Sequence, residues 1–222
     1  MPLILGKQGG DTIEGTEERR VTMNKGIGNL GPRRIIAAVR HSEDLKLACA
    51  SDLPVVFLLV GDLFTVQDYV KQVIDSGKKV FLHVDFIAGL GSDPIIIKYL
   101  AEKVRPTGII STKTHLIKHA KKNGLAAVQR LFLIDSAALE NGIANVQQSG
   151  PDAVEIMPGL IPRVITEVSE RLSVPVIAGG LIHHHEEIET ALQAGAAAVS
   201  MGSRALWVKE AKRPRTDEAV VR

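Results

Sequence analysis

The stretches Val174-Pro-Val-Ile-Ala-Gly-Gly180 and Ala198-Val-Ser-Met-Gly-Ser203 decide the fold of this chain. Each begins with a short apolar, partly β-branched run, which is typical of a strand buried on both faces. Each then ends in glycine, which indicates a turn where the strand stops. The two stretches therefore predict consecutive parallel strands, each followed by a tight loop.

The same unit, an apolar run followed by a helical segment, repeats along the chain before these stretches. The earlier runs are Ile35–Val39, Val55–Val60, Val80–Val84, Gly108–Ile110, Ala126–Ile134 and Ala153–Met157. Eight strand-helix units in strict alternation predict a parallel sheet that closes into a compact, single-domain (β/α)₈ TIM barrel of the α/β class. A doubly wound open sheet is the alternative, but it usually carries its glycine-rich turn after the first strand. The first turn here, Val39-Arg40-His41-Ser42, contains no glycine, which favours the barrel.

Composition divides the chain into three parts. Residues 1–33 are rich in glycine and charge and show no apolar periodicity, so we expect a flexible N-terminal extension. Residues 34–209 form the predicted barrel, and residues 210–222 form a polar C-terminal tail. No apolar run approaches the ~20 residues of a membrane span, so we expect a cytoplasmic protein with no membrane partner. The formal net charge of +2 neither requires nor excludes a nucleic-acid partner.

The loops after the seventh and eighth predicted strands have the features of a phosphate site. Barrels often bind phosphate there through backbone N–H groups, which approach the oxygens closely only where no Cβ intervenes. Gly179, Gly180 and Gly202 meet this need, and Ser203 adds a hydroxyl. The alternative is that these glycines only form tight turns.

Polar residues also stand at the ends of the other predicted strands, where they would line a ligand cup. These candidate ligand contacts are Arg40, Asp85, Lys113, Gln129, Arg130 and Glu155. A second interpretation of the last three is a buried polar cluster that locks the barrel, because a buried charge requires a partner. Asp135 and Ser136 are candidates for capping the helix that follows them.

The histidines do not predict a metal site. His183, His184 and His185 are consecutive, and neighbouring residues of a helix diverge by about 100°. His83 alternates with Asp85 along its strand, and we interpret it as a hydrogen-bonded structural histidine. We expect no metal, no cofactor and no assigned catalytic residue.

Five segments together resemble the glycerol uptake operon antiterminator family. They are His83–Asp85, Gly108–Lys113, Gln129–Ser136, Glu155–Gly159 and Ala178–Ile182, and they occur in the order of that family over roughly residues 35–207. The resemblance implies a cytoplasmic regulator, not an enzyme, that responds to glycerol 3-phosphate. It further implies action on the mRNA leader of glycerol-uptake genes, where such proteins prevent premature transcription termination.

The resemblance is not complete. The family often carries an Arg-Thr-Lys-like segment where this chain has His183–His185, and Thr-Ser-Asn where it has Met201–Ser203. In the implied complex, the phosphate lies at the glycines, while Asp85, Lys113 and Glu155 reach the glycerol hydroxyls. Two alternatives stay open: an enzyme acting on a small phosphorylated substrate, and a metabolite sensor with a protein partner. Lys121-Lys122 and Lys209–Arg215 are candidate RNA contacts, and a homo-oligomer is possible.

Overall fold

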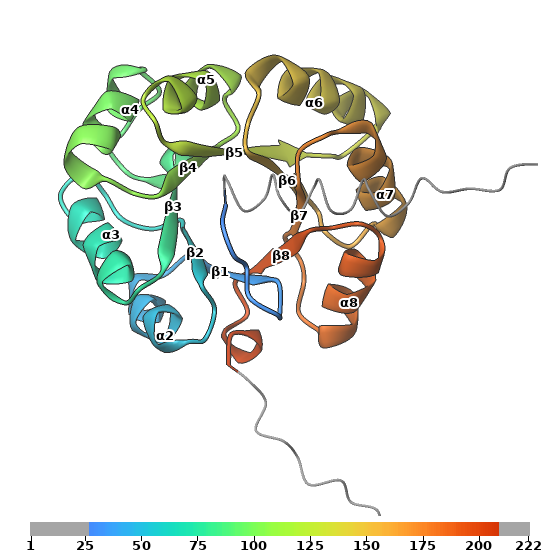
Figure 1. The fold of residues 1–222 in the computed structure, drawn as a ribbon, viewed down its shortest axis with the longest axis horizontal. Coiled ribbons are helices and arrows are strands. Elements are labelled where there is room, and N and C mark those ends of the chain that lie inside the picture. Colours follow the sequence, from blue (N-terminus) through green and yellow to red (C-terminus); the bar gives the residue numbers. More distant parts are fainter. Residues whose placement is uncertain (1–26, 209–222) are drawn as a thin grey trace, which may run out of the picture.

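The computed structural model describes residues 27–208, which form a closed barrel of eight parallel strands (Figure 1). Each strand pairs with its neighbours in sequence order, and β8 pairs with β1 to close the ring. The strands are β1 (Ile35–Val39), β2 (Val55–Leu58), β3 (Lys79–His83), β4 (Gly108–Ser111), β5 (Ala126–Phe132), β6 (Ala153–Met157), β7 (Val176–Gly179) and β8 (Ala198–Met201). The predicted (β/α)₈ barrel is confirmed.

Helices connect the strands and surround the barrel in Figure 1. The α-helices are α2 (Leu45–Ala50), α3 (Val66–Asp75), α4 (Ile95–Tyr99), α5 (Thr114–Lys122), α6 (Ser136–Ser149), α7 (Pro162–Arg171) and α8 (His185–Gln193). Short helical turns are η1 (Ser42–Asp44), η2 (Val84–Phe86) and η4 (Arg204–Leu206), and the π-helical η3 (Leu100–Val104) continues α4. No helix within residues 27–208 is long and apolar enough to cross a membrane.

Successive side chains of each strand point alternately into the barrel and outward, which produces two apolar layers. One set of side chains, including Phe57, Phe81, Ile110 and Val128, fills the inside of the barrel. The other set packs against the surrounding helices. The rings of Phe57 and Phe81 meet edge to face at 5.8 Å, which closes the interior below the level of the strand ends. The barrel is therefore a packed core, and open space for a ligand can exist only above it.

The boundary expected at residue 33 is wrong for residues 27–33. Ile27 and Leu30 are buried and belong to the inner apolar layer, so this segment covers the N-terminal mouth of the barrel (Figure 1). Gly28 lies against the flexible end of the Lys79 side chain, and its φ of +88° is a left-handed conformation that favours glycine. An isolated pair of apolar residues among glycines gives no periodic signal, which is why the segment resembled a flexible extension. Residues 1–26 and the predicted tail, 210–222, lie outside the described residues.

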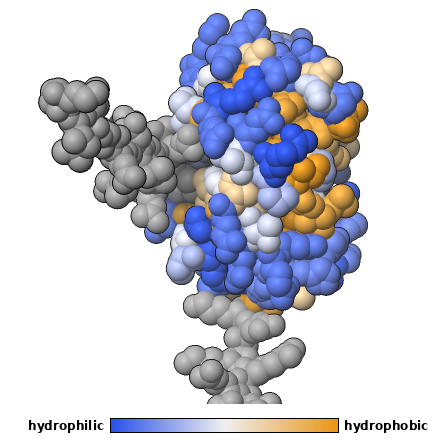
Figure 2. All heavy atoms as spheres, turned by 90° about the vertical axis from the view of Figure 1, so that its right-hand side faces the viewer, coloured by the Kyte–Doolittle hydropathy of each residue, from blue (hydrophilic) through white to orange (hydrophobic). Residues whose placement is uncertain are grey.

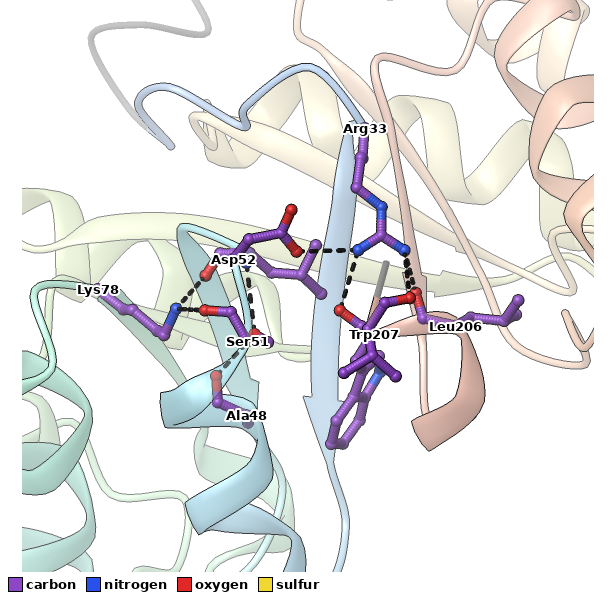
Figure 3. Close-up of polar contacts among 9 residues, drawn as sticks. Arg33, Ala48, Ser51, Asp52, Lys78, Leu206 and Trp207 are labelled. Carbon is purple, nitrogen blue, oxygen red and sulfur yellow. Dashed lines mark hydrogen bonds and ion pairs between the residues drawn. The ribbon is translucent and has the colours of Figure 1, made fainter. Parts of the chain in front are cut away.

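Arg33 fastens this N-terminal segment to the end of the barrel (Figure 3). Its guanidinium donates hydrogen bonds to the backbone carbonyls of Leu206 and Trp207 and pairs with Asp52 at 3.0 Å. Nearby, Lys78 donates to the carbonyls of Ser51 and Leu53. These contacts close the barrel on the side opposite the loops that follow the strands.

Candidate functional site

We call the C-terminal end of the barrel interior, above the apolar layer, the cup. Three buried polar side chains from three strands form its floor. Arg130 on β5 donates through Nε to Glu155 Oε2 on β6 at 2.7 Å. Ser200 on β8 donates to Glu155 Oε1 at 2.5 Å. Arg130 is 3% exposed and Glu155 is 0% exposed. The interpretation of Arg130 and Glu155 as a buried pair is therefore confirmed, whereas their contact with a ligand stays a prediction.

Gly179, the last residue of β7, is required by this floor. A Cβ on Gly179 would stand 2.6 Å from Ser200 Oγ and 2.7 Å from Glu155 Oε1, which no real Cβ can do. Gly180 follows at φ +79°, a left-handed conformation that favours glycine. The two glycines of the Ala-Gly-Gly turn are thus needed for different reasons. Gly179 leaves room for buried polar atoms, and Gly180 adopts a left-handed backbone conformation.

His83 differs from its expected role. Its side chain is fully buried at the end of β3, yet neither ring nitrogen has a hydrogen-bond partner among the described residues. The interpretation as a hydrogen-bonded structural histidine is therefore wrong. Arg130 Nη2 is also buried and without a partner in residues 27–208. Both side chains lie against the ring of Phe86, at 4.5 Å from the His83 ring and 5.9 Å from Arg130 Cζ.

Asp85 is held at the rim between β3 and β4. Its carboxylate accepts hydrogen bonds from Ser111 Oγ at 3.0 Å and from the Thr112 backbone N–H at 2.7 Å. Lys113 Nζ lies 3.6 Å from Asp85 Oδ1. Burial raises the pKa of Asp85, but the Thr112 N–H, His83 and the two hydroxyls outweigh it, so the pKa is lowered. Asp85 is thus a fixed negative charge beside the cup.

Gly202, Ser203 and Arg40 form the opposite rim, where β8 meets β1. A Cβ on Gly202 would pass 3.8 Å from Arg40 Cδ, so the arginine side chain runs beside this glycine. Within the described residues, Arg40 forms no ion pair, and the N–H groups of Gly180, Gly202 and Ser203 have no backbone acceptor. The rim therefore offers free amide donors next to a guanidinium, which is the chemistry that an anion needs.

Gln129 does not belong to the cup. It precedes Arg130 on β5, and successive residues of a strand point to opposite faces. Its side chain lies behind the sheet, where Oε1 accepts from Ser149 Oγ on α6 and Nε2 lies 3.4 Å from Thr114 Oγ1 on α5. The prediction that Gln129 contacts a ligand is wrong, because Arg130 already occupies the inward position.

Asp135 caps α6, as one interpretation of the sequence expected. Its Oδ1 accepts from the Ala138 backbone N–H at 2.7 Å, so this carboxylate stabilises a helix end outside the cup.

Residues 35–207 match the family described as glycerol-3-phosphate responsive antiterminator. The chain belongs to this family. The crystal structure of a glycerol uptake operon antiterminator regulatory protein from Listeria monocytogenes is 37% identical, with a TM-score of 0.77 over 80% of this chain and 96% of that chain.

Two further relatives of this antiterminator-family protein are similar over nearly their whole length. A glycerol uptake operon antiterminator-related protein from Thermotoga maritima is 37% identical, with a TM-score of 0.70 over 78% of this chain and 96% of that chain. A protein of Escherichia coli K12 named "Uncharacterized protein YgcP" is 36% identical over 173 residues, which are 78% of this chain and 91% of its own.

The histidines that distinguish this antiterminator-family chain lie outside the cup floor. The backbone N–H groups of His183 and His184 donate to Glu187 Oε2 at 2.7 and 2.9 Å, so they cap α8. No group of three His, Cys, Asp or Glu side chains within residues 27–208 could hold a metal ion.

Sequence reasoning missed an apolar rim at the end of β5 and on the loops that follow β5, β6 and β7. We define the apolar rim as the exposed side chains Phe132, Ile134, Leu160, Ile161 and Leu181. Figure 2, which faces the side of α7 and α8, shows apolar residues gathered along one edge of the barrel. A groove of about 320 Å³ between the starts of α7 and α8 includes Leu160 in its lining. The signal in the sequence is the pair Phe132 and Ile134: Phe132 is the last residue of β5, whereas Ile134, also predicted in the fifth strand, lies in the loop beyond it.

Proposed function

We propose that this protein binds glycerol 3-phosphate in the cup and uses that binding to control its affinity for an mRNA leader, which prevents transcription termination at glycerol-uptake genes. The observation that carries the proposal is the pairing of free backbone amides with Arg40 at the β8–β1 rim, in a chain of the antiterminator family. The phosphate lies at Gly179, Gly180, Gly202 and Ser203.

Charge supports this orientation of the ligand. Glu155 is paired with Arg130, and Asp85 with Lys113, so these four charges cancel in two pairs. Among the three cationic candidates for ligand contact, Arg40, Lys113 and Arg130, only Arg40 has no acidic partner in the described part of the chain, and it stands beside Gly202. A phosphate with about −2 charge is therefore favoured at β7, β8 and β1, and the glycerol hydroxyls extend toward Asp85, Lys113 and Glu155.

The helices around the barrel differ sharply in charge, which suggests where RNA binds. Helix α5 carries Lys118, Lys121 and Lys122 with two histidines and no acidic residue, whereas α8 carries three glutamates, one histidine and no lysine or arginine. Lys121 pairs with Asp152, which leaves Lys118 and Lys122 available for phosphate contacts. RNA affinity depends on such neutralised phosphates, so the α5 side is the favoured surface. The candidate segment Lys209–Arg215 lies outside the described residues.

Ligand binding is tested by thermal unfolding with glycerol 3-phosphate. At 100 times its dissociation constant, the ligand should add about 2.7 kcal/mol to the free energy of unfolding. Gly202→Val should abolish most of this gain, because the new side chain covers the amides while its first carbon has room beside Ala38 and Arg40. Arg40→Gln should weaken binding. The matched control is Arg34→Gln, which removes an exposed arginine before the other end of β1.

RNA control is tested by filter binding to the leader RNA with and without glycerol 3-phosphate. A ligand shifts RNA affinity only if it favours one conformation over another, so the two affinities should differ. Lys118→Gln with Lys122→Gln should reduce the slope of log affinity against log salt by up to about 1.4 to 1.8. Lys46→Gln with Lys71→Gln, on α2 and α3, is the control pair. Equal RNA affinities with and without the ligand would refute this function.

A further inference from the structure

His83 is a buried polar side chain that the fold of residues 27–208 leaves unsatisfied. Both ring nitrogens are shielded from solvent and have no hydrogen-bond partner there, and its side chain is 0% exposed. Buried polar groups are nearly always hydrogen-bonded, because an unmet donor or acceptor loses its water without compensation. A group left in this state at the strand ends of a barrel points to a partner that arrives from outside the chain.

The charges around His83 determine what that partner can be. Burial first, and then the nearby positive charge of Arg130, lower the pKa of His83 to about 3, while Asp85 opposes the shift. Asp85 Oδ2 lies 4.0 Å from His83 Nδ1. At neutral pH the ring is therefore uncharged, with one nitrogen donating and the other accepting. An uncharged ring beside a carboxylate does not favour an anion, but it suits a hydroxyl group, which also both donates and accepts.

The position of His83 in the barrel fits the hydroxyl end of the ligand. His83 ends β3, whereas the proposed phosphate contacts follow β7 and β8, on the far side of the eight-strand ring. Arg130 and Glu155, on β5 and β6, occupy the floor between the two ends. A small molecule whose phosphate is held at the glycines therefore extends across this floor toward β3.

We infer that His83 is a specificity-determining residue that recognises a hydroxyl group of a small polyol phosphate, an inference that rests on the proposed function. The ring of Phe86 touches the His83 ring edge to face and is itself 51% exposed. Phe86 belongs to the short turn η2 and covers the approach to both His83 and Arg130. Because His83 is fully buried beside this ring, a ligand can contact it only if the exposed Phe86 ring turns aside.

Calorimetric titration of the full chain with three probes tests this inference. The probes are glycerol 3-phosphate, propyl phosphate, which has the same phosphate and carbon chain without free hydroxyls, and inorganic phosphate. The wild-type protein should bind glycerol 3-phosphate at least about tenfold more tightly than propyl phosphate, as expected for one or more hydrogen bonds to a hydroxyl. His83→Leu should reduce this preference by about two- to tenfold, as expected for the loss of one hydrogen bond, and should keep its affinity for propyl phosphate within about twofold.

Two further variants make the outcome decisive. His83→Gln restores a hydrogen-bond donor and acceptor near the position of Nε2, so it should recover part of the preference for glycerol 3-phosphate over propyl phosphate. If His83→Leu fails to fold, His83→Gln serves as the test variant in its place. His119→Leu, on the outer helix α5, is the matched control and should behave as the wild type. Equal weakening of glycerol 3-phosphate and propyl phosphate in His83→Leu, or a wild type without preference, overturns the inference alone. A wild type that binds none of the three probes overturns the proposed function and the inference together.

Discussion

Removing the carboxylate of Glu155 should strongly destabilise the barrel. Glu155→Gln keeps the size of the side chain and an oxygen that accepts from Ser200, but it leaves the Arg130 guanidinium without its counter-charge. Arg130 is 3% exposed and its Nη2 already has no partner in residues 27–208, so water cannot replace the lost ion pair. Breaking a buried pair in this way costs about 3–5 kcal/mol. In a chain of this size, that lowers the melting temperature by about 6–20 °C.

Removing both charges should cost much less than removing one. Arg130→Met combined with Glu155→Gln leaves no unpaired charge, and buried pairs replaced by uncharged residues of similar volume are often neutral. Chemical unfolding of the wild type, both single variants and the double variant gives a coupling free energy for the pair. We expect the double variant to lie within about 1–2 kcal/mol of the wild type.

Two results would refute this reasoning. A loss below about 1 kcal/mol in Glu155→Gln would mean that Arg130 is not buried against this carboxylate. A double variant as unstable as the sum of the single variants would mean that the two side chains contribute independently. In either case, Arg130 and Glu155 would not act as a coupled buried ion pair.

Because the pKa of His83 is lowered to about 3 in the folded protein, only the unfolded chain takes up this proton below about pH 6.5. The free energy of unfolding, measured by chemical unfolding, should therefore fall by about 2–3 kcal/mol from pH 7 to pH 4.5. The same pH dependence in His83→Leu would show that protonation of His83 is not its cause. Ile27→Ala should cost about 2–4 kcal/mol in the same assay, and a loss below about 0.5 kcal/mol would show that residues 27–33 do not seal the barrel. Asp135→Ala should lower the melting temperature by about 2–4 °C through loss of the α6 cap, which an unchanged unfolding curve would exclude.

The fold could be predicted because its signals are local and repeated. β1 and β6 have the predicted bounds, since a charged residue precedes each run and an arginine or a proline follows it. β2 and β5 end two residues earlier than predicted, at Leu58 and Phe132. The extra apolar residues there belong to loops at the rim, and hydrophobicity alone cannot separate a buried strand end from an exposed apolar loop.

The site was only partly predictable because its contacts join distant parts of the chain. The period of two along a strand, applied to the adjacent Gln129 and Arg130, would have excluded one of them, since only one can face inward, and the structure shows that it is Gln129 that faces outward. By contrast, the lack of a hydrogen-bond partner for His83 within residues 27–208 depends on the side chains that β4, β5 and η2 place around it. No local sequence pattern predicts that environment. The need for glycine at 179 is also non-local, because it arises from Glu155 and Ser200.

The residue that supplies positive charge to the cup is also determined by contacts between distant parts of the chain. By sequence, His183–His185 stand where the family often carries basic residues, which suggested a cup with a missing cation. The structure directs the backbones of His183 and His184 toward Glu187 and leaves their side chains exposed. Arg40 instead lies beside Gly202, at the end of the strand that closes the barrel against β8. Because Arg130 and Lys113 are each held by a carboxylate, the proposed affinity for phosphate depends on Arg40, and the fixed charge of Asp85 keeps the anionic end of the ligand away from β3.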